Sequence, residues 1–117
     1  MNDFVIILVG PENFGTDAIR MAWQAAGIEL LGPLPLHKLD AESLERALGV
    51  VMDISLDADA LFEFSEFLEQ RQLPHLYAVR EDQVQRRDGA YIVSSAKADI
   101  EAIVEALTSE GDKGIRH

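Results

Sequence analysis

Hydrophobic residues follow two alternating patterns along this chain. Nearly continuous apolar runs of strand length occupy Phe4–Val9, Ile28–Leu31, Val50–Ile54, Leu76–Val79 and Tyr91–Val93. Between these runs, apolar residues recur every three or four positions, as on one face of a helix, in Thr16–Ala26, Asp40–Leu48, Asp59–Gln70 and Lys97–Ser109. A short, polar fifth helix is expected at Asp82–Arg87. Strands that are apolar throughout and alternate with helices predict a parallel sheet covered on both faces.

Right-handed crossovers turn this order into a doubly wound α/β fold of the flavodoxin-like type, with strand order 2-1-3-4-5. The expected N-caps are Asp40 and Asp59, and Gly27 and Gly49 are expected to take the left-handed conformation after a helix. Pro74 should end the third long helix before the fourth strand. Residues 1–110 then form one domain, and the non-periodic residues 111–117 are expected to form a mobile tail.

Composition narrows the range of partners and locations. The 117 residues include 21 acidic and 10 basic side chains, giving a formal net charge of -11. This balance argues against binding to nucleic acid or to an anionic membrane surface. No apolar stretch approaches the ~20 residues of a membrane-spanning helix, and the first apolar run lacks the basic flank of a signal peptide. The absence of cysteine fits a cytoplasmic location.

Asp53 is the most informative single residue. It directly follows Val50-Val51-Met52 near the end of the third run, and open α/β sheets place their ligand sites at the carboxyl ends of their strands. The other strands end in Gly10-Pro11, Val79-Arg80 and Ser94-Ser95. These ends offer few groups that could share a reaction with a carboxylate. The pattern therefore suggests a catalytic scaffold that retains one reactive group.

Several features together resemble the receiver domain of two-component response regulators, over about residues 4–110. They are the element order, Asp53, Pro74 before the fourth strand, the Gly27–Pro33 segment, and the Gly89–Val93 segment that leads into the fifth strand. The resemblance implies that Asp53 is the phosphoacceptor. In that family two acidic residues after the first strand hold Mg²⁺ with this aspartate. A hydroxyl residue ends the fourth strand, and a Lys-Pro pair ends the fifth.

The chain departs from the family at each of those supporting positions. The acidic pair aligns with Gly10 and Pro11, and Glu12 matches only a third acidic residue that is often found there. The hydroxyl residue aligns with Val79, and the Lys-Pro pair with Ser94 and Ser95. Phosphoryl transfer depends on positioning and on neutralising the transferred oxygens, and Mg²⁺ needs carboxylate ligands. The expectation is a degenerate pocket that uses neither magnesium nor any other cofactor.

Other candidate groups have ordinary structural explanations beside the functional ones. Asp53 could instead form only local hydrogen bonds, and Ser94-Ser95 could bind an anion or simply begin the last helix. The Gly10–Gly15 loop lacks the spacing of a phosphate-binding loop. A metal site could be rebuilt from three carboxylates, but these are more simply capping or surface groups: Glu12, Asp57 and Asp59. Two histidines are expected in loops or at a strand edge, and one aromatic residue is expected to be partly exposed: His37, His75 and Phe62.

The resemblance also suggests an interaction surface. In receivers the fourth helix, fifth strand and last helix form the usual output and dimerisation face. The matching positions here are Val84, Arg87, Tyr91, Lys97 and Glu101, and Tyr91 matches the aromatic switch position. Their mixed charges would suit a homodimer with a two-fold axis.

The function expected from the sequence is that of a stand-alone, atypical receiver, or pseudo-receiver, which is not an enzyme. It would act in bacterial signal transduction by contact with a protein partner, such as a histidine kinase-type component. Two alternatives stay open. Asp53 could be a working phosphoacceptor in a phosphorelay, or the chain could be a small ligand-binding module, because flavodoxin-like folds serve many functions.

Overall fold

The sheet contains five parallel strands, and its order is β2-β1-β3-β4-β5. The computed structural model describes residues 4–11, 14–34, 41–80 and 91–115. The strands are β1 (Phe4–Val9), β2 (Ile28–Leu34), β3 (Gly49–Asp53), β4 (His75–Arg80) and β5 (Tyr91–Val93). This topology is the flavodoxin-like α/β fold that the alternating pattern predicts, and it confirms the expected order 2-1-3-4-5.

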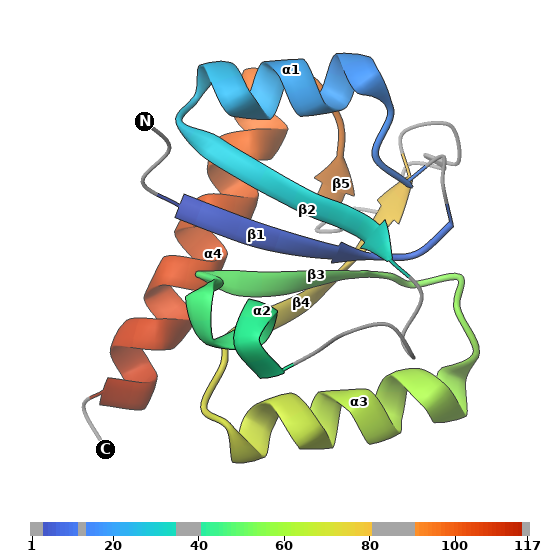
Figure 1. Cartoon of the computed structure of the whole chain (residues 1–117), viewed down its shortest axis with the longest axis vertical. Coiled ribbons are helices and arrows are strands. Elements are labelled where there is room, and N and C mark those ends of the chain that lie inside the picture. The colour runs from blue at the N-terminus through green and yellow to red at the C-terminus, as the bar shows by residue number, and fades with distance from the viewer. Residues whose placement is uncertain (1–3, 12–13, 35–40, 81–90, 116–117) are drawn as a thin grey trace.

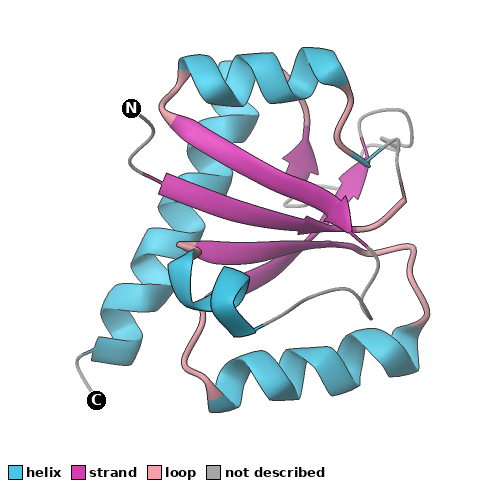
Figure 2. Ribbon diagram, viewed as in Figure 1, coloured by secondary structure: helices cyan, strands magenta, loops and turns pink. Residues whose placement is uncertain are grey.

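Helices cover both faces of the sheet (Figure 1; Figure 2). They are α1 (Asp17–Ala25), α2 (Ala41–Arg46), α3 (Ala58–Gln70) and α4 (Lys97–Ile115). α1 and α4 pack on one face, while α2 and α3 pack on the other. No helix in the described part of the chain is long and apolar enough to span a membrane.

The two faces hold separate hydrophobic layers because successive side chains of a strand point to opposite sides. Along β1, Ile6 and Leu8 join the layer under α1 and α4, whereas Ile7 and Val9 join the layer under α2 and α3. All four side chains are fully buried. β1 and β3 are therefore central strands buried on both faces, and their carboxyl ends lie in the middle of one sheet edge.

Most elements lie where the sequence places them, and the differences occur at their ends. β1 and β5 have the expected bounds, whereas β2 continues three residues past Leu31. α4 runs on to Ile115, so residues 111–115 are helical and the expected tail is wrong over that stretch. The expected helix at Asp82–Arg87 and the expected cap Asp40 lie outside the described residues.

Two residues that the sequence places at helix ends, Gly49 and Asp59, have other roles in the structure. Gly27 has a φ of 86°, as expected after α1, but Gly49 is the first residue of β3 and is not among the residues with positive φ. A Cβ on Gly49 would lie 2.7 Å from Leu107 Cδ2, so this glycine is needed for close packing against α4. The N-cap of α3 is Asp57 and not Asp59, because the Asp57 side chain accepts from Ala60 N at 3.0 Å.

Candidate functional site

Asp53 lies at the centre of the carboxyl edge of the sheet. It is the last residue of β3, and only 1% of its surface is exposed. Its position is fixed on the β4 side by register, because Asp53 pairs with Ala78 and the next amide, Ile54 N, donates to Ala78 O at 3.0 Å. A carboxylate so deeply buried needs both hydrogen bonds and a counter-charge.

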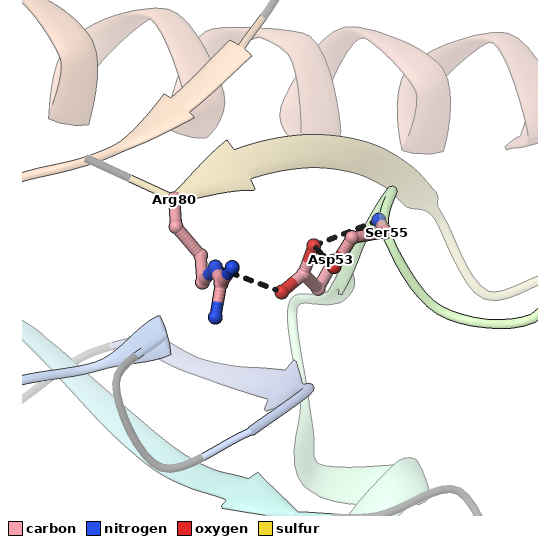
Figure 3. A network of polar contacts seen from close by, with 3 residues as sticks. All are labelled: Asp53, Ser55 and Arg80. Atoms are coloured by element: carbon pink, nitrogen blue, oxygen red, sulfur yellow. Dashed lines mark hydrogen bonds and ion pairs between the residues drawn. The ribbon is translucent and has the colours of Figure 1, made fainter. Parts of the chain in front are cut away.

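One oxygen of Asp53 holds the turn between β3 and α3. Its Oδ1 accepts from Ser55 N at 2.8 Å and from Ser55 Oγ at 2.7 Å (Figure 3). The carbonyl of Asp53 accepts from Leu56 N at 3.1 Å, so the backbone folds back on itself before the cap at Asp57. An aspartate that bonds the amide two residues later commonly starts such a turn. Asp53 therefore positions the start of α3.

The other oxygen of Asp53 faces a cation. Arg80 is the last residue of β4, and its Nε lies 3.6 Å from Asp53 Oδ2 (Figure 3). The Arg80 side chain is 14% exposed, so the pair is largely shielded from water. Within the described residues, Oδ2 accepts no hydrogen bond. Its compensation is electrostatic, which is effective in a site of low dielectric constant.

Sequence reasoning missed this partner because it identified Arg80 only as a residue at the end of the fourth strand. The register of the strands nevertheless indicates that Arg80 lies near Asp53. Asp53 and Ala78 are register partners, and a residue two positions further along a strand points to the same face. Arg80 should therefore project from the same edge and the same face as Asp53. The strand ends are expected to offer few groups that act with Asp53, and the structure adds Arg80 at the end of β4 as one of them.

The end of β1 is closed by packing. Gly10 follows β1, and a Cβ on it would lie 3.0 Å from Asp53 Cβ and 3.0 Å from Phe14 Cδ2. Phe14 is fully buried in the layer under α1. A larger side chain at position 10 would have to displace this ring or Asp53. Pro11 is exposed and has no side-chain ligand atom, while Glu12 lies outside the described residues.

The end of β5 is occupied by the start of α4. Ser94 is 2% exposed, and its Oγ donates to Asp99 Oδ2 at 2.7 Å and accepts from Ala96 N at 3.0 Å. Its carbonyl accepts from Trp23 Nε1 at 2.9 Å, which joins this turn to α1. These bonds agree with the expected role at the start of a helix. Ser95 is exposed.

The remaining candidates are not brought together with Asp53. Val79 is half-buried in register with Ile92 of β5. His75 Nε2 is hydrogen-bonded to Ser65 Oγ at 2.7 Å, which ties β4 to α3, and His37 lies outside the described residues. Across the described ranges, no group of three or more His, Asp or Glu side chains is placed to hold a metal ion.

The expected interaction surface is described only in part. Lys97 and Glu101 form an exposed pair on α4, with Nζ 3.8 Å from Oε1. Tyr91 is half-buried and packs against the layer under α1 and α4. Val84 and Arg87 lie outside the described residues. Phe62 on α3 is 63% exposed, which confirms the expectation for that ring.

A pocket lies at the opposite edge of the sheet from Asp53. Its volume is about 370 Å³, and it lies beside α2 and the turn after α3. The residues that line it are Leu44, Glu45, Arg71 and Leu73. Among the residues that the structure describes, none at the carboxyl ends of the strands lines this pocket.

Comparison with protein-family models and with curated proteins gives no match for this chain. The function must therefore be inferred from the site itself. Its central feature is a buried carboxylate, bonded through one oxygen to its own turn and paired through the other with an arginine. This arrangement is suited to holding the sheet edge in a fixed form.

Proposed function

We propose that the chain is an atypical receiver-like domain, without metal-dependent phosphotransfer, that signals by contact with a protein partner. One observation carries the proposal. At the position where the receiver resemblance places a phosphoacceptor, Asp53 is buried and paired with Arg80. The strand order 2-1-3-4-5 supports the resemblance at the level of fold. The partner is a histidine kinase-type component or a second copy of the chain.

The loss of phosphotransfer follows from what surrounds Asp53. A phosphoryl group would need several charges or donors around its oxygens. The Ser94 hydroxyl already bonds Asp99 and Ala96, and Lys97 is exposed beside Glu101. Gly10 has no side chain to act as a ligand, and a Cβ at this position would press on Asp53 and Phe14. Arg80 is the cation left near Asp53 among the described residues, and its charge is already opposed by that carboxylate.

Treatment with acetyl phosphate and Mg²⁺ tests the chemical half of this proposal. We expect the intact mass of the protein to stay unchanged, because Asp53 is buried and, in the part of the chain that the structure describes, it is not grouped with other side chains that could hold a metal ion. A conventional receiver treated in parallel serves as the positive control. A single phosphoryl adduct that disappears in Asp53→Asn would contradict the proposal and favour a phosphoacceptor in a phosphorelay.

Light scattering over a micromolar concentration series tests self-association as the simplest partner contact. We expect a dimer that Lys97→Glu weakens, because the change removes one of the two charges described on the proposed surface. Exposed ion pairs contribute only about 0–1 kcal/mol each, so apolar contact from Tyr91 must add to them. Glu69→Lys on α3 is the matched control. A monomer at every concentration, or a dimer indifferent to Lys97→Glu, would reject this surface.

A further inference from the structure

We infer that the pocket beside α2 and the turn after α3 binds a small zwitterion with an apolar body, namely an α-amino acid with an apolar side chain such as leucine. The pocket has a volume of about 370 Å³ and is lined by Leu44, Glu45, Arg71 and Leu73. This volume is at the lower end of the range of roughly 300–1,000 Å³ for ligand pockets, so it suits a small molecule. The inference goes beyond the proposed signalling role and does not depend on it.

Two leucines form the apolar part of the pocket. Leu44 on α2 is buried in the hydrophobic layer under α2 and α3, and Leu73 is half-buried and packs against that layer. Figure 1 shows α2 and the C-terminal end of α3 on the same face of the sheet. Side chains that belong to a close-packed layer have fixed positions. An apolar ligand group that contacts them is removed from water, which favours binding.

The C-terminal end of α3 fixes the two residues that line the pocket from this helix. Leu73 N donates to Leu68 O at 3.0 Å, and Gln72 N donates to Glu69 O at 3.0 Å. Gln72 has a φ of 57°, so the chain leaves the helix through the left-handed conformation. These two bonds and this turn form a Schellman motif. Arg71 and Leu73 therefore leave the backbone at fixed positions on either side of Gln72.

The Arg71 guanidinium is held so that it can receive a carboxylate. Its Cζ lies over the Phe67 ring, 4.5 Å from the centroid, and Phe67 stacks on Phe64 with ring centroids 5.7 Å apart. Phe64 packs against the layer under α2 and α3, so two stacked rings connect the guanidinium to the core. Contact with a ring uses the face of a guanidinium and leaves the N–H groups at its edge available. Those N–H groups match the two oxygens of a carboxylate.

Glu45 supplies the opposite charge at the same pocket. Both Glu45 and Arg71 are exposed, and neither forms an ion pair within the described residues. A ligand with a single charge would be attracted by one of these groups and repelled by the other, whereas a zwitterion complements both. An α-amino acid carries its two charges at one carbon atom and its side chain apart from them. An apolar side chain can therefore contact Leu44 and Leu73 while both charges are matched.

Amide NMR spectra of isotope-labelled protein, titrated with free leucine at constant pH and ionic strength, test this inference. Leucine should shift the amide signals of Arg71, Gln72 and Leu73 until they saturate. Isocaproate lacks the amino group and isoamylamine lacks the carboxylate, so both should bind more weakly than leucine. Glycine lacks the apolar body and should give no saturable shift. If leucine gives no saturable shift up to its solubility limit, the inference is overturned.

Single variants test the two charged side chains. Arg71→Gln should weaken leucine binding about tenfold, because it removes a charge-assisted partner of the carboxylate. Glu45→Gln should weaken binding about fivefold or less, as expected for an exposed charge. Arg46→Gln on α2 and Glu69→Gln on α3 are the matched controls, since both residues are exposed and neither is among the described residues that line the pocket. Both controls should leave the affinity unchanged.

Three results would contradict the inference even if leucine binds. Equal loss of affinity in Arg71→Gln and Arg46→Gln would show that only the net charge matters, and would overturn the pocket as the site. Isocaproate or isoamylamine binding as tightly as leucine would overturn the zwitterion. All four changes affect exposed side chains, so each variant should keep the native Tm. None of these measurements involves a phosphoryl donor or a protein partner, so a failure here is distinct from a failure of the proposed signalling role.

Discussion

A buried carboxylate needs hydrogen bonds and a counter-charge, and in Asp53 each of the two oxygens receives one of these. Oδ1 takes the hydrogen bonds of Ser55, and Oδ2 takes the charge of Arg80. An asparagine at this position could keep one acceptor for Ser55, but it would turn an NH₂ group toward the guanidinium. Both groups would then be donors. At the scale of single residues, the site is thus specific for a carboxylate even without phosphoryl chemistry.

The helix cap beside this site gives a residue-scale prediction. Asp57→Ala should lower the free energy of unfolding by about 1 kcal/mol, because it removes the acceptor for Ala60 N at the start of α3. Asp59→Ala is the matched control and should cost about 0.5 kcal/mol or less, since it removes only a favourable charge in the first turn. Urea unfolding followed by circular dichroism measures both. An equal or larger loss in Asp59→Ala would show that the cap is misassigned.

Sequence reasoning could place Asp53 at a strand end but could not choose its neighbours. The apolar run before Asp53 fixes where the strand stops, so the position of the carboxylate follows from the sequence alone. The choice of Asp57 over Asp59 as cap depends on the turn that Asp53 and Ser55 close. The filling of the β1 end by Phe14 depends on packing between distant segments. These contacts cannot be derived from periodicity.

At the scale of elements, the strand cores were predictable and some ends were not. Gly32-Pro33 resembles a turn, yet β2 continues through it to Leu34. The pairing with β1 shifts register between Ile7 and Val9, and Gly10 N donates to Leu34 O at 3.1 Å. A Cβ on Gly32 would lie 2.5 Å from Leu8 O, so glycine is needed at this irregular point. The dipeptide marks a bulge inside a strand, a distinction that depends on the neighbouring strand.

The C-terminal end of α4 could not be predicted from the sequence pattern. Periodicity in the sequence ends near Ser109, and glycines at 111 and 114 disfavour a helix. The backbone nevertheless stays helical to Ile115. Leu107 is the last buried side chain described on α4. Propensity and amphipathic pattern therefore predicted the packed part of this helix but not its extension.

At the scale of the whole molecule, the sheet joins two hydrophobic layers into one folding unit. Trp23 belongs to the layer under α1 and α4, and Leu68 belongs to the layer under α2 and α3. Both are fully buried, and the strands between them contribute side chains to each layer. Because each layer needs the same central strands, neither layer should persist when the other is lost.

Leu68→Ala tests this coupling across the sheet. The change should lower the free energy of unfolding by about 2–5 kcal/mol, as expected when a buried leucine is truncated. Trp23 fluorescence reports the opposite layer, and far-ultraviolet circular dichroism reports the helices of both. We expect the two urea transitions to shift together, since one cooperative unit gives coincident transitions.

Phe62→Ala, which truncates an exposed ring on the same helix, should shift neither transition by much. If Leu68→Ala moves the dichroism transition and leaves the Trp23 transition in place, the two layers unfold separately. In that case a change at the start of α3 could not be transmitted to α1 and α4 through the core.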